Sequence, residues 1–361
     1  MIVIGADTHK ASHTLAAVEA ATGRVRATQT ARSRTEGHEE LLIWGRALDP
    51  ERVWAIEDCR HVSGRLERFL TGHGERVVRI APKRMAGARR SQRERGKSDP
   101  IDAEAIARAA IREGIETLPA AHLDEEAMEI KLLLDHREDL VAERTRIQNR
   151  LRWHLHEFWP DFEVPAGALD RTVWLERLSR RLRGQGHGAR VRVVREQLRR
   201  LRELARQTQT LERELRGLVE RKAARLTALP GCGTLTAAKL IAETAGAERF
   251  ASDAHFARLA GVAPVPASSG LRDRHRLDRG GNRQLNLALH RIAVTQGRVF
   301  APAKAYLARK RAEGKSRKEA LRCLKRQLAR TVLRLLRPLR DTSPQPPTVM
   351  HGVPIRTPCL T

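Results

Sequence analysis

The chain has 361 residues, which is long for one typical domain and fits two domains with a connector between them. Its 69 Lys and Arg against 43 Asp and Glu leave a formal net charge of +26, which predicts attraction to a polyanion. Hydrophobic residues make up 41%, which excludes wholesale disorder, and aromatic residues make up only 3%, which argues against base reading on aromatic platforms.

Cysteine usage and hydropathy indicate a soluble protein of a reducing compartment. The four cysteines are scattered without a Cys-x-x-Cys pair or a paired histidine, so neither a zinc site nor a disulfide framework is predicted. No apolar run approaches the roughly 18 residues of a membrane span. We therefore expect a cytoplasmic protein that does not bind membranes.

The first 110 residues have the pattern of an α/β domain. Strands are predicted at 2–6, 14–18, 24–30, 53–56 and 76–80, and helices at 36–48, 61–71 and 101–112. The order of three strands followed by alternating helices and strands predicts a mixed sheet covered by helices. This order resembles the ribonuclease H-like fold.

A long helical pattern follows from 124 to 159 and ends at Pro160. The glycine-rich stretch 184–188 separates it from a second helix that carries leucines and valines from 194 to 218. Apolar spacings of three and four residues fit an antiparallel coiled coil that joins two globular parts. They fit equally well two amphipathic helices of one bundle.

The remaining chain changes composition to Ala, Gly and Leu after Arg225, with short helices predicted to about Arg337. A proline-rich stretch from Thr342 onward predicts a disordered tail. The predicted domains are an α/β domain at 1–118, a coiled-coil connector at 119–224, a helical domain at 225–341 and the tail at 342–361.

Four acidic residues stand at positions where ligands gather. Asp7 and Glu57 end predicted strands, and Asp99 and Asp102 open a helix three residues apart, on one face. Carboxylates that converge repel one another, and Mg²⁺ offsets this while keeping sites for phosphate and water. Two such ions would stabilise the attacking and leaving oxygens of phosphoryl transfer. Alternatively, Asp99 and Asp102 are ordinary acids of a helix N-terminus.

A set of short motifs then resembles one protein family over nearly the whole chain. The motifs are Ile4-Gly-Ala-Asp7-Thr-His-Lys10, Ala55-Ile-Glu57, Lys97-Ser-Asp99-Pro-Ile-Asp102-Ala103, Leu229-Pro-Gly-Cys-Gly233, Phe256-Ala-Arg-Leu-Ala-Gly261-Val-Ala-Pro264, Ser269-Gly270 and Gly281-Asn282. Together they resemble the DEDD-type insertion-sequence transposases, recombinases with a RuvC-like N-terminal domain. The resemblance implies that Asp7, Glu57, Asp99 and Asp102 are the catalytic, metal-binding acids.

One motif departs from the family pattern. The family commonly has Glu-Ala-Thr-Gly after the second acidic strand, whereas this chain has Glu57-Asp58-Cys59-Arg60. Asp58 is therefore an alternative to Glu57, or shares its role. We favour Glu57 because it occupies the matching position.

Ser269 lies in the loop 264–270 and precedes Gly270. A serine in such a loop is usually only a turn residue. The resemblance implies instead that Ser269 is the nucleophile that forms a phosphoserine link to DNA, with Ser268 as the neighbouring alternative. Serine needs a base or a metal for activation. The resemblance implies that the metal-bound acids of the RuvC-like domain provide this, from the same or another subunit.

Three regions are predicted to contact phosphates. The motif around Gly231, Gly233 and Lys239 looks like a helix-hairpin-helix, whose glycine turn suits a DNA phosphate, although an ordinary interhelical turn is the alternative. Residues 302–340 hold fourteen Lys and Arg against two glutamates. Residues 82–97 hold one acid and seven basic residues, which favours phosphate contact over a solvated face: Lys83, Arg84, Arg89, Arg90, Arg93, Arg95 and Lys97.

The resulting hypothesis is a DNA recombinase that mobilises its own insertion sequence. The resemblance implies Mg²⁺, with two ions per site, and a homo-oligomer, dimer or tetramer, on paired DNA ends. It also implies a structured noncoding guide RNA that pairs with donor and target DNA. Two alternatives stay open: a RuvC-like junction nuclease that activates water and uses Ser269 only structurally, and a non-enzymatic coiled-coil DNA-binding protein.

Overall fold

The computed structural model describes residues 1–57, 60–80, 98–122, 124–267, 275–276, 278 and 280–337. The N-terminal elements are β1 (Ile2–Thr8), β2 (Ser12–Glu19), β3 (Val25–Arg32), α1 (Thr35–Leu48), β4 (Arg52–Glu57), α2 (Arg60–Gly72), β5 (Val77–Ile80) and α4 (Asp99–Glu113). The later ones are α5 (Glu125–Phe158), α6 (Thr172–Arg183), α7 (Ala189–Thr227), α8 (Thr234–Thr244), α9 (Asp253–Leu259), β6 (Val265–Pro266), β7 (His275–Arg276), α10 (Arg283–Val299), α11 (Ala301–Ala312) and α12 (Arg317–Leu336).

The N-terminal part is a five-stranded mixed sheet in the order β3-β2-β1-β4-β5. β1 is antiparallel to β2 and parallel to β4, and β5 is parallel to β4. The central strand β1 is buried along its whole length, whereas the edge strand β3 is partly exposed at alternate residues. The predicted order of strands and helices and the mixed α/β sheet are thus confirmed.

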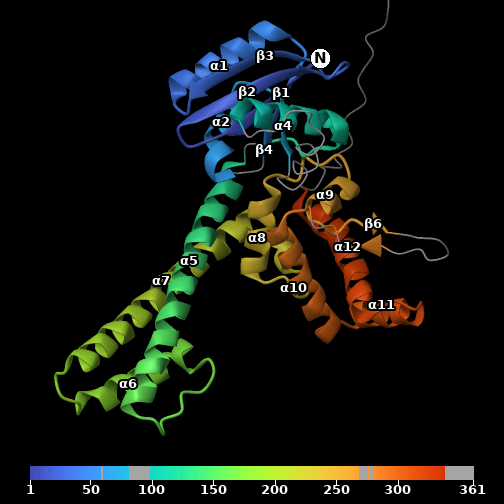
Figure 1. Ribbon diagram of the computed structural model, residues 1–361. Coiled ribbons are helices and arrows are strands. Elements are labelled where there is room, and N and C mark those ends of the chain that lie inside the picture. Colours follow the sequence, from blue (N-terminus) through green and yellow to red (C-terminus); the bar gives the residue numbers. More distant parts are fainter. Residues whose placement is uncertain are drawn as a thin grey trace, which may run out of the picture.

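Two apolar layers cover the sheet because neighbouring residues of a strand point to opposite faces. Ile4, Ala6 and Trp54 pack on the side of α1 and α2. Val3 and Ala55 belong to the opposite layer, whose helix is α4 with its small side chains. Figure 1 shows this layered part at one end of the molecule, in blue and teal.

Helices α5 and α7 form an arm that projects away from the sheet (Figure 1). The two helices are antiparallel, as the order of the ion pairs between them shows. Lys222 pairs with Asp124 at the base, then Arg137 with Glu212 and Arg200 with Glu143, and Arg190 with Glu157 near the tip. Leu175, Leu178 and Leu182 of α6, a helix that the sequence analysis left out, pack on Leu151 and Leu155 at the tip. The two predicted long helices are present, and coiled-coil packing between them stays a prediction.

The C-terminal part is helical, as predicted, and shares its core with the base of the arm. Ile130 of α5 and Leu226 of α7 belong to the same buried cluster as Leu240, Phe256 and Leu289. This continuous packing joins the predicted connector to the helical domain. The predicted tail at 342–361 lies outside the described residues. Within the described ranges, no helix is both long and apolar enough to cross a membrane.

Candidate active site

Asp7, His9 and Asp99 bring their side chains together where β1 ends and α4 begins. The Nε2 atom of His9 lies 3.1 Å from Oδ2 of Asp7 and 3.6 Å from Oδ1 of Asp99. One ligand atom from each of the three residues lies within 4.8 Å of the others. Asp7 is only 7% exposed, whereas the Asp99 side chain is 54% exposed, so the cluster has a buried floor and an open side.

The strand register places Glu57 on the same side of the sheet as Asp7. Val53 and Ala55 of β4 face α4, and Glu57 continues this alternation at the strand end. In the parallel pair of β1 and β4, Ala6 is opposite Ile56, so Glu57 is one step further on, level with Asp7. The structure therefore sets both strand-end acids on the face covered by α4.

The first turn of α4 contributes the remaining two acids. Ser98 precedes the helix, and Asp99, Pro100 and Asp102 lie in its first turn. Asp102 is 7% exposed, and its charge, like that of Asp99, raises the pKa of Asp7. Asp7, Asp99 and Asp102 thus gather at the end of β1, and Glu57 lies level with Asp7 on the neighbouring strand.

Burial is the main reason why the pKa of Asp7 is raised above its usual value. The neighbouring charges of Asp102 and Asp99 add to this, and His9 opposes it through its charge and its hydrogen bond. A buried carboxylate beside other carboxylates is stabilised by a divalent cation, whose charge lowers such pKa values. Two carboxylates and one imidazole are suitable donors, with the oxygen ligands favouring hard cations such as Mg²⁺ or Mn²⁺.

His9 is a site residue to which the sequence analysis gave no role. It stands two residues after Asp7, so in an extended segment both side chains lie on the same side. The two-residue spacing from Asp7 was therefore the feature of the sequence from which His9 could have been predicted as a site residue. The short link between β1 and β2, closed by the hydrogen bond from His9 N to Ser12 O, holds the ring there.

Several predicted site residues lie outside the described residues. These are Asp58, Ser268 and Ser269, together with the basic residues Arg84, Arg89, Arg90, Arg93, Arg95 and Lys97. The two strands that flank the serines in sequence are described: β6 and β7 pair antiparallel, with Val265 opposite Arg276.

The predicted phosphate-binding turn lies between α7 and α8. Gly231 has a φ of 83°, a backbone conformation that favours glycine, and a methyl group there would lie in tight contact, 3.0 Å from Cβ of Thr295 on α10. Gly233 is exposed and directly precedes α8. Lys239 is 6% exposed, and its ammonium lies 2.7 Å from Glu138 of α5. In this arrangement Lys239 anchors α8 to the arm, and phosphate binding by the turn stays a prediction.

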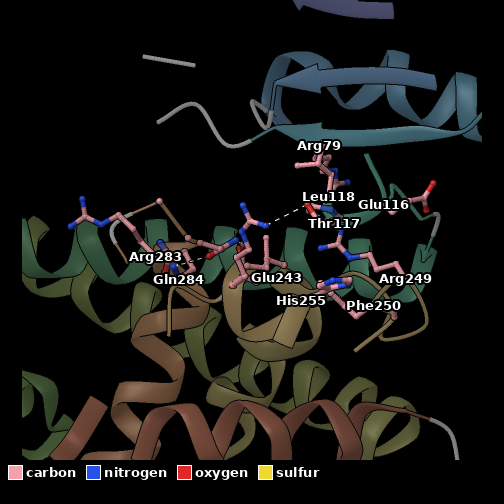
Figure 2. A pocket seen from close by; sticks show the side chains of 17 residues that line it. Arg79, Glu116, Thr117, Leu118, Glu243, Arg249, Phe250, His255, Arg283 and Gln284 are labelled. Carbon is pink, nitrogen blue, oxygen red and sulfur yellow. Dashed lines mark hydrogen bonds between the residues drawn. The ribbon is translucent and has the colours of Figure 1, made fainter. Parts of the chain in front are cut away.

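A cavity of about 290 Å³ lies between the α/β part and the helical part (Figure 2). Arg79 and the segment Glu116–Pro119 line one side, and Arg249, His255 and Arg283 line the other. Two of the lining arginines also join the two parts: Arg258 forms an ion pair with Glu113, and Nη1 of Arg249 donates to the carbonyl of Ala120 at 3.1 Å. These contacts hold the acid-bearing sheet against the C-terminal helices.

Two protein-family models match separate parts of the chain. Residues 4–160 match the DEDD transposase family of IS110, and residues 223–308 match the transposase family IS116/IS110/IS902. The first match contains Asp7, Glu57, Asp99 and Asp102. The second contains Ser269 and the glycine turn.

Two proteins of insertion elements agree with these family matches. The uncharacterized 44.8 kDa protein of insertion element IS116 from Streptomyces clavuligerus is 28% identical, over 96% of this chain and 97% of its own. The uncharacterized 43.6 kDa protein of IS110 from Streptomyces coelicolor is 32% identical, over 67% and 71%. A RuvC chain from T. thermophilus, solved with a Holliday junction substrate, is 16% identical and covers 34% of this chain and 99% of its own, at a TM-score of 0.27. By its family matches and its relatives, the chain belongs to the IS110 family of DNA transposases.

Proposed function

We propose that this transposase cuts and rejoins DNA strands through a phosphoserine intermediate, with Ser269 as the nucleophile and the acidic cluster as the metal site. The observation that carries the proposal is the gathering of Asp7, His9 and Asp99 within 4.8 Å, with Asp102 close enough to raise the pKa of Asp7. A set of mutually repelling carboxylates at a half-open sheet edge suits cation-assisted phosphoryl transfer.

Asp7, Asp99, Asp102 and Glu57 would hold the cations, for which we propose two Mg²⁺ ions. Bound there, the ions would neutralise phosphate charge and favour ionisation of an attacking hydroxyl. Within the chain, Asp7 is fixed in place by burial and by the hydrogen bond with His9. The exposed side chain of Asp99 leaves that side of the cluster open to a DNA phosphate.

In the proposed reaction, Oγ of Ser269 forms a bond to a DNA phosphorus while the bond from that phosphorus to a deoxyribose oxygen breaks. The hydroxyl proton of the serine leaves to a base, and the released deoxyribose oxygen takes up a proton. The phosphoester is conserved, so the reverse attack by a deoxyribose hydroxyl on the phosphoserine rejoins strands without ATP. Ser268 is the alternative nucleophile.

We further propose that a homo-oligomer, dimer or tetramer, acts on paired DNA ends and that a structured noncoding RNA selects them. The support is the family membership together with composition. A chain with +26 net charge and 3% aromatic residues has abundant phosphate-binding groups and few base-stacking ones, which fits a protein that leaves sequence choice to base pairing.

The test is a cleavage assay with the full chain, Mg²⁺, RNA transcribed from the nucleotides flanking its coding region, and DNA duplexes that carry those nucleotides. We expect a denaturation-resistant protein–DNA adduct that is lost in Ser269→Ala and in Asp7→Asn and kept in Ser268→Ala. Both inactive variants should still bind DNA. Strand breakage at the wild-type rate without an adduct in Ser269→Ala would replace the proposal by a nuclease that activates water.

A further inference from the structure

A second cavity, of about 340 Å³, lies in the C-terminal part among the β6–β7 pair, α11 and α12. It is separate from the acidic cluster and from the cavity between the two parts. The loop 261–264, which leads into β6, forms an apolar wall with Val262 and Pro264, and Tyr306 of α11 adds an aromatic ring. Six basic side chains line it: Arg276, Lys310, Lys315, Arg322, Lys325 and Arg326.

Acids in and beside this second cavity balance part of its charge: Lys310 pairs with Glu313 at 2.7 Å, Arg326 with Asp253 at 3.3 Å and Arg322 with Glu319 at 3.7 Å. Asp278 accepts a hydrogen bond from the backbone of Gly280 at 2.8 Å. Glu319 accepts hydrogen bonds from Ser316 N at 2.9 Å and Ser316 Oγ at 2.7 Å, in the capping box of α12. The six basic side chains still outnumber these four acids, so the cavity keeps a net positive charge toward whatever enters it.

Lys325 is the residue that best indicates an anion-binding site, because its side chain is 6% exposed and yet lines this cavity. Its ammonium donates to Oδ1 of Asn286 at 2.7 Å. Asn286 is held in this orientation because its Nδ2 donates to the carbonyls of Ala260 and Gly261, at 3.0 and 2.9 Å. These hydrogen bonds hold the Lys325 ammonium against the neutral amide oxygen of Asn286 and connect it to the loop that leads into β6.

A buried ammonium on a neutral partner is costly unless an anion joins it. Consistent with this cost, burial and the neighbouring charge of Arg322 lower the pKa of Lys325. An anion in the cavity would reverse the penalty. The volume lies near the lower end of ligand sites, which fits a phosphate with its adjoining sugars.

We propose that this cavity binds a phosphodiester group of the DNA strand on which the enzyme acts, with Lys325 at its floor and Arg322 and Arg276 at its rim. The choice of DNA rests on the proposed function. His275 and Arg276, which follow the Ser269 segment in sequence, and Pro264, which precedes it, all line the cavity. A phosphate bound here would therefore contact β7 and the residue that leads into β6, on either side of the proposed nucleophile in sequence. Apolar side chains such as Val262 and Pro264 would pack against the deoxyribose.

The test compares Lys325→Met with Lys318→Met, an exposed lysine on the same helix that lines none of the cavities described above. Affinity of the full chain for a fluorescent DNA duplex is measured against salt, with chelator present so that no cleavage occurs. We expect Lys325→Met to weaken binding about tenfold and to reduce the salt slope by about one, and Lys318→Met to change the affinity less than about twofold. Equal effects of the two changes would overturn the proposal.

Thermal unfolding separates a binding role from a structural one. Because Lys325→Met removes a buried charge, we expect its unfolding temperature to equal or exceed that of the wild type. Inorganic phosphate at constant ionic strength should raise the unfolding temperature of the wild type and not that of the variant. Destabilisation together with an unchanged salt slope would make Lys325 a structural residue. Arg322→Gln, at the partly exposed rim, provides a second variant and should also lower the slope.

Two further measurements identify the ligand and distinguish failure of this inference from failure of the proposed function. An RNA strand of the same sequence should be less affected by Lys325→Met than the DNA, and the opposite result would assign the cavity to RNA and overturn the choice of DNA. Ser269→Ala should bind DNA as the wild type does. A chain that binds DNA through Lys325 but forms no phosphoserine adduct would disprove only the proposed chemistry.

Discussion

Gly5 of β1 lies directly against the backbone of Ala103 of α4. A methyl group on Gly5 would be 2.1 Å from the carbonyl oxygen of Ala103 and 2.5 Å from the amide nitrogen of Ala107. The missing side chain lets α4 approach the sheet. This close approach positions the first turn of α4, with Asp99 and Asp102, beside Asp7, two residues along β1 from Gly5.

Gly5→Ala is therefore expected to lower both stability and activity. The added methyl group meets backbone atoms, which cannot move aside as a flexible side chain does, so α4 must shift. We expect the free energy of unfolding to fall by about 2 kcal/mol or more. Metal-dependent DNA cleavage should fall further than stability alone explains. Gly72→Ala is the control, because a methyl group there meets nothing within 4 Å and should cost less than about 0.5 kcal/mol.

The acidic cluster predicts opposite effects of one substitution on stability and on metal binding. In the absence of divalent cations, Asp7→Asn should raise the unfolding temperature, because it removes a buried carboxylate that Asp102 and Asp99 repel. Mn²⁺ or Mg²⁺ should raise the unfolding temperature of the wild type and have little effect on the variant. Asp139→Asn, at an exposed position of α5, should respond to metal as the wild type does. A metal response in Asp7→Asn equal to that of the wild type would argue against the site.

The basic segment predicts a change in the salt dependence of nucleic-acid binding. Neutralising Arg89, Arg90, Arg93 and Arg95 together should lower the slope of log affinity against log salt by about 3 to 4 if each contacts one phosphate. Fluorescence anisotropy at several salt concentrations provides the slope. An unchanged slope would identify this segment as a solvated face.

His13 predicts a loss of stability as the pH falls below neutrality. It is fully buried, its ring stacks on that of His38 with centroids 5.3 Å apart, and burial first, then the charges of His38, His9 and Arg65, lowers its pKa to about 4. Between pH 6.5 and about 4, His13 is protonated in the unfolded chain but not in the folded chain. The contribution of neutral His13 to the free energy of unfolding is therefore fully present above pH 6.5 and declines below it. This decline amounts to at most about 3 kcal/mol.

Urea unfolding at pH 7 and pH 5 measures this contribution of His13 directly. His13→Leu should lose less stability than the wild type over this interval, because the other titrating groups act on both proteins alike. His187→Leu, at an exposed position, should keep the wild-type dependence. If His13→Leu and the wild type decline in parallel, the buried imidazole does not take part.

Much of the fold could be predicted because its signals are local. The short apolar runs at 2–6 and 53–56 and the helical spacing in 36–48 reproduce β1, β4 and α1 closely. A strand buried on both faces requires an unbroken apolar run, and a helix buried on one face requires apolar residues three and four apart. The end of α5 and the start of α7 could likewise be predicted, from Pro160 and from the glycines at 184–188. The proximity of Asp7 and Asp102 was predicted by the same means, from strand ends and a three-residue spacing, and their role as metal ligands stays a prediction.

Other features depended on which elements meet, and no local pattern encodes that. Lys239 had the sequence context of a phosphate ligand, yet the packing of α8 on α5 pairs it with Glu138. Lys325 was one of fourteen basic residues of 302–340 until the fold buried it beside Asn286, far away in sequence. The cost of burying a charge depends on partners from distant segments, so only the tertiary structure decided which cations face solvent, which form ion pairs and which are buried against a neutral partner.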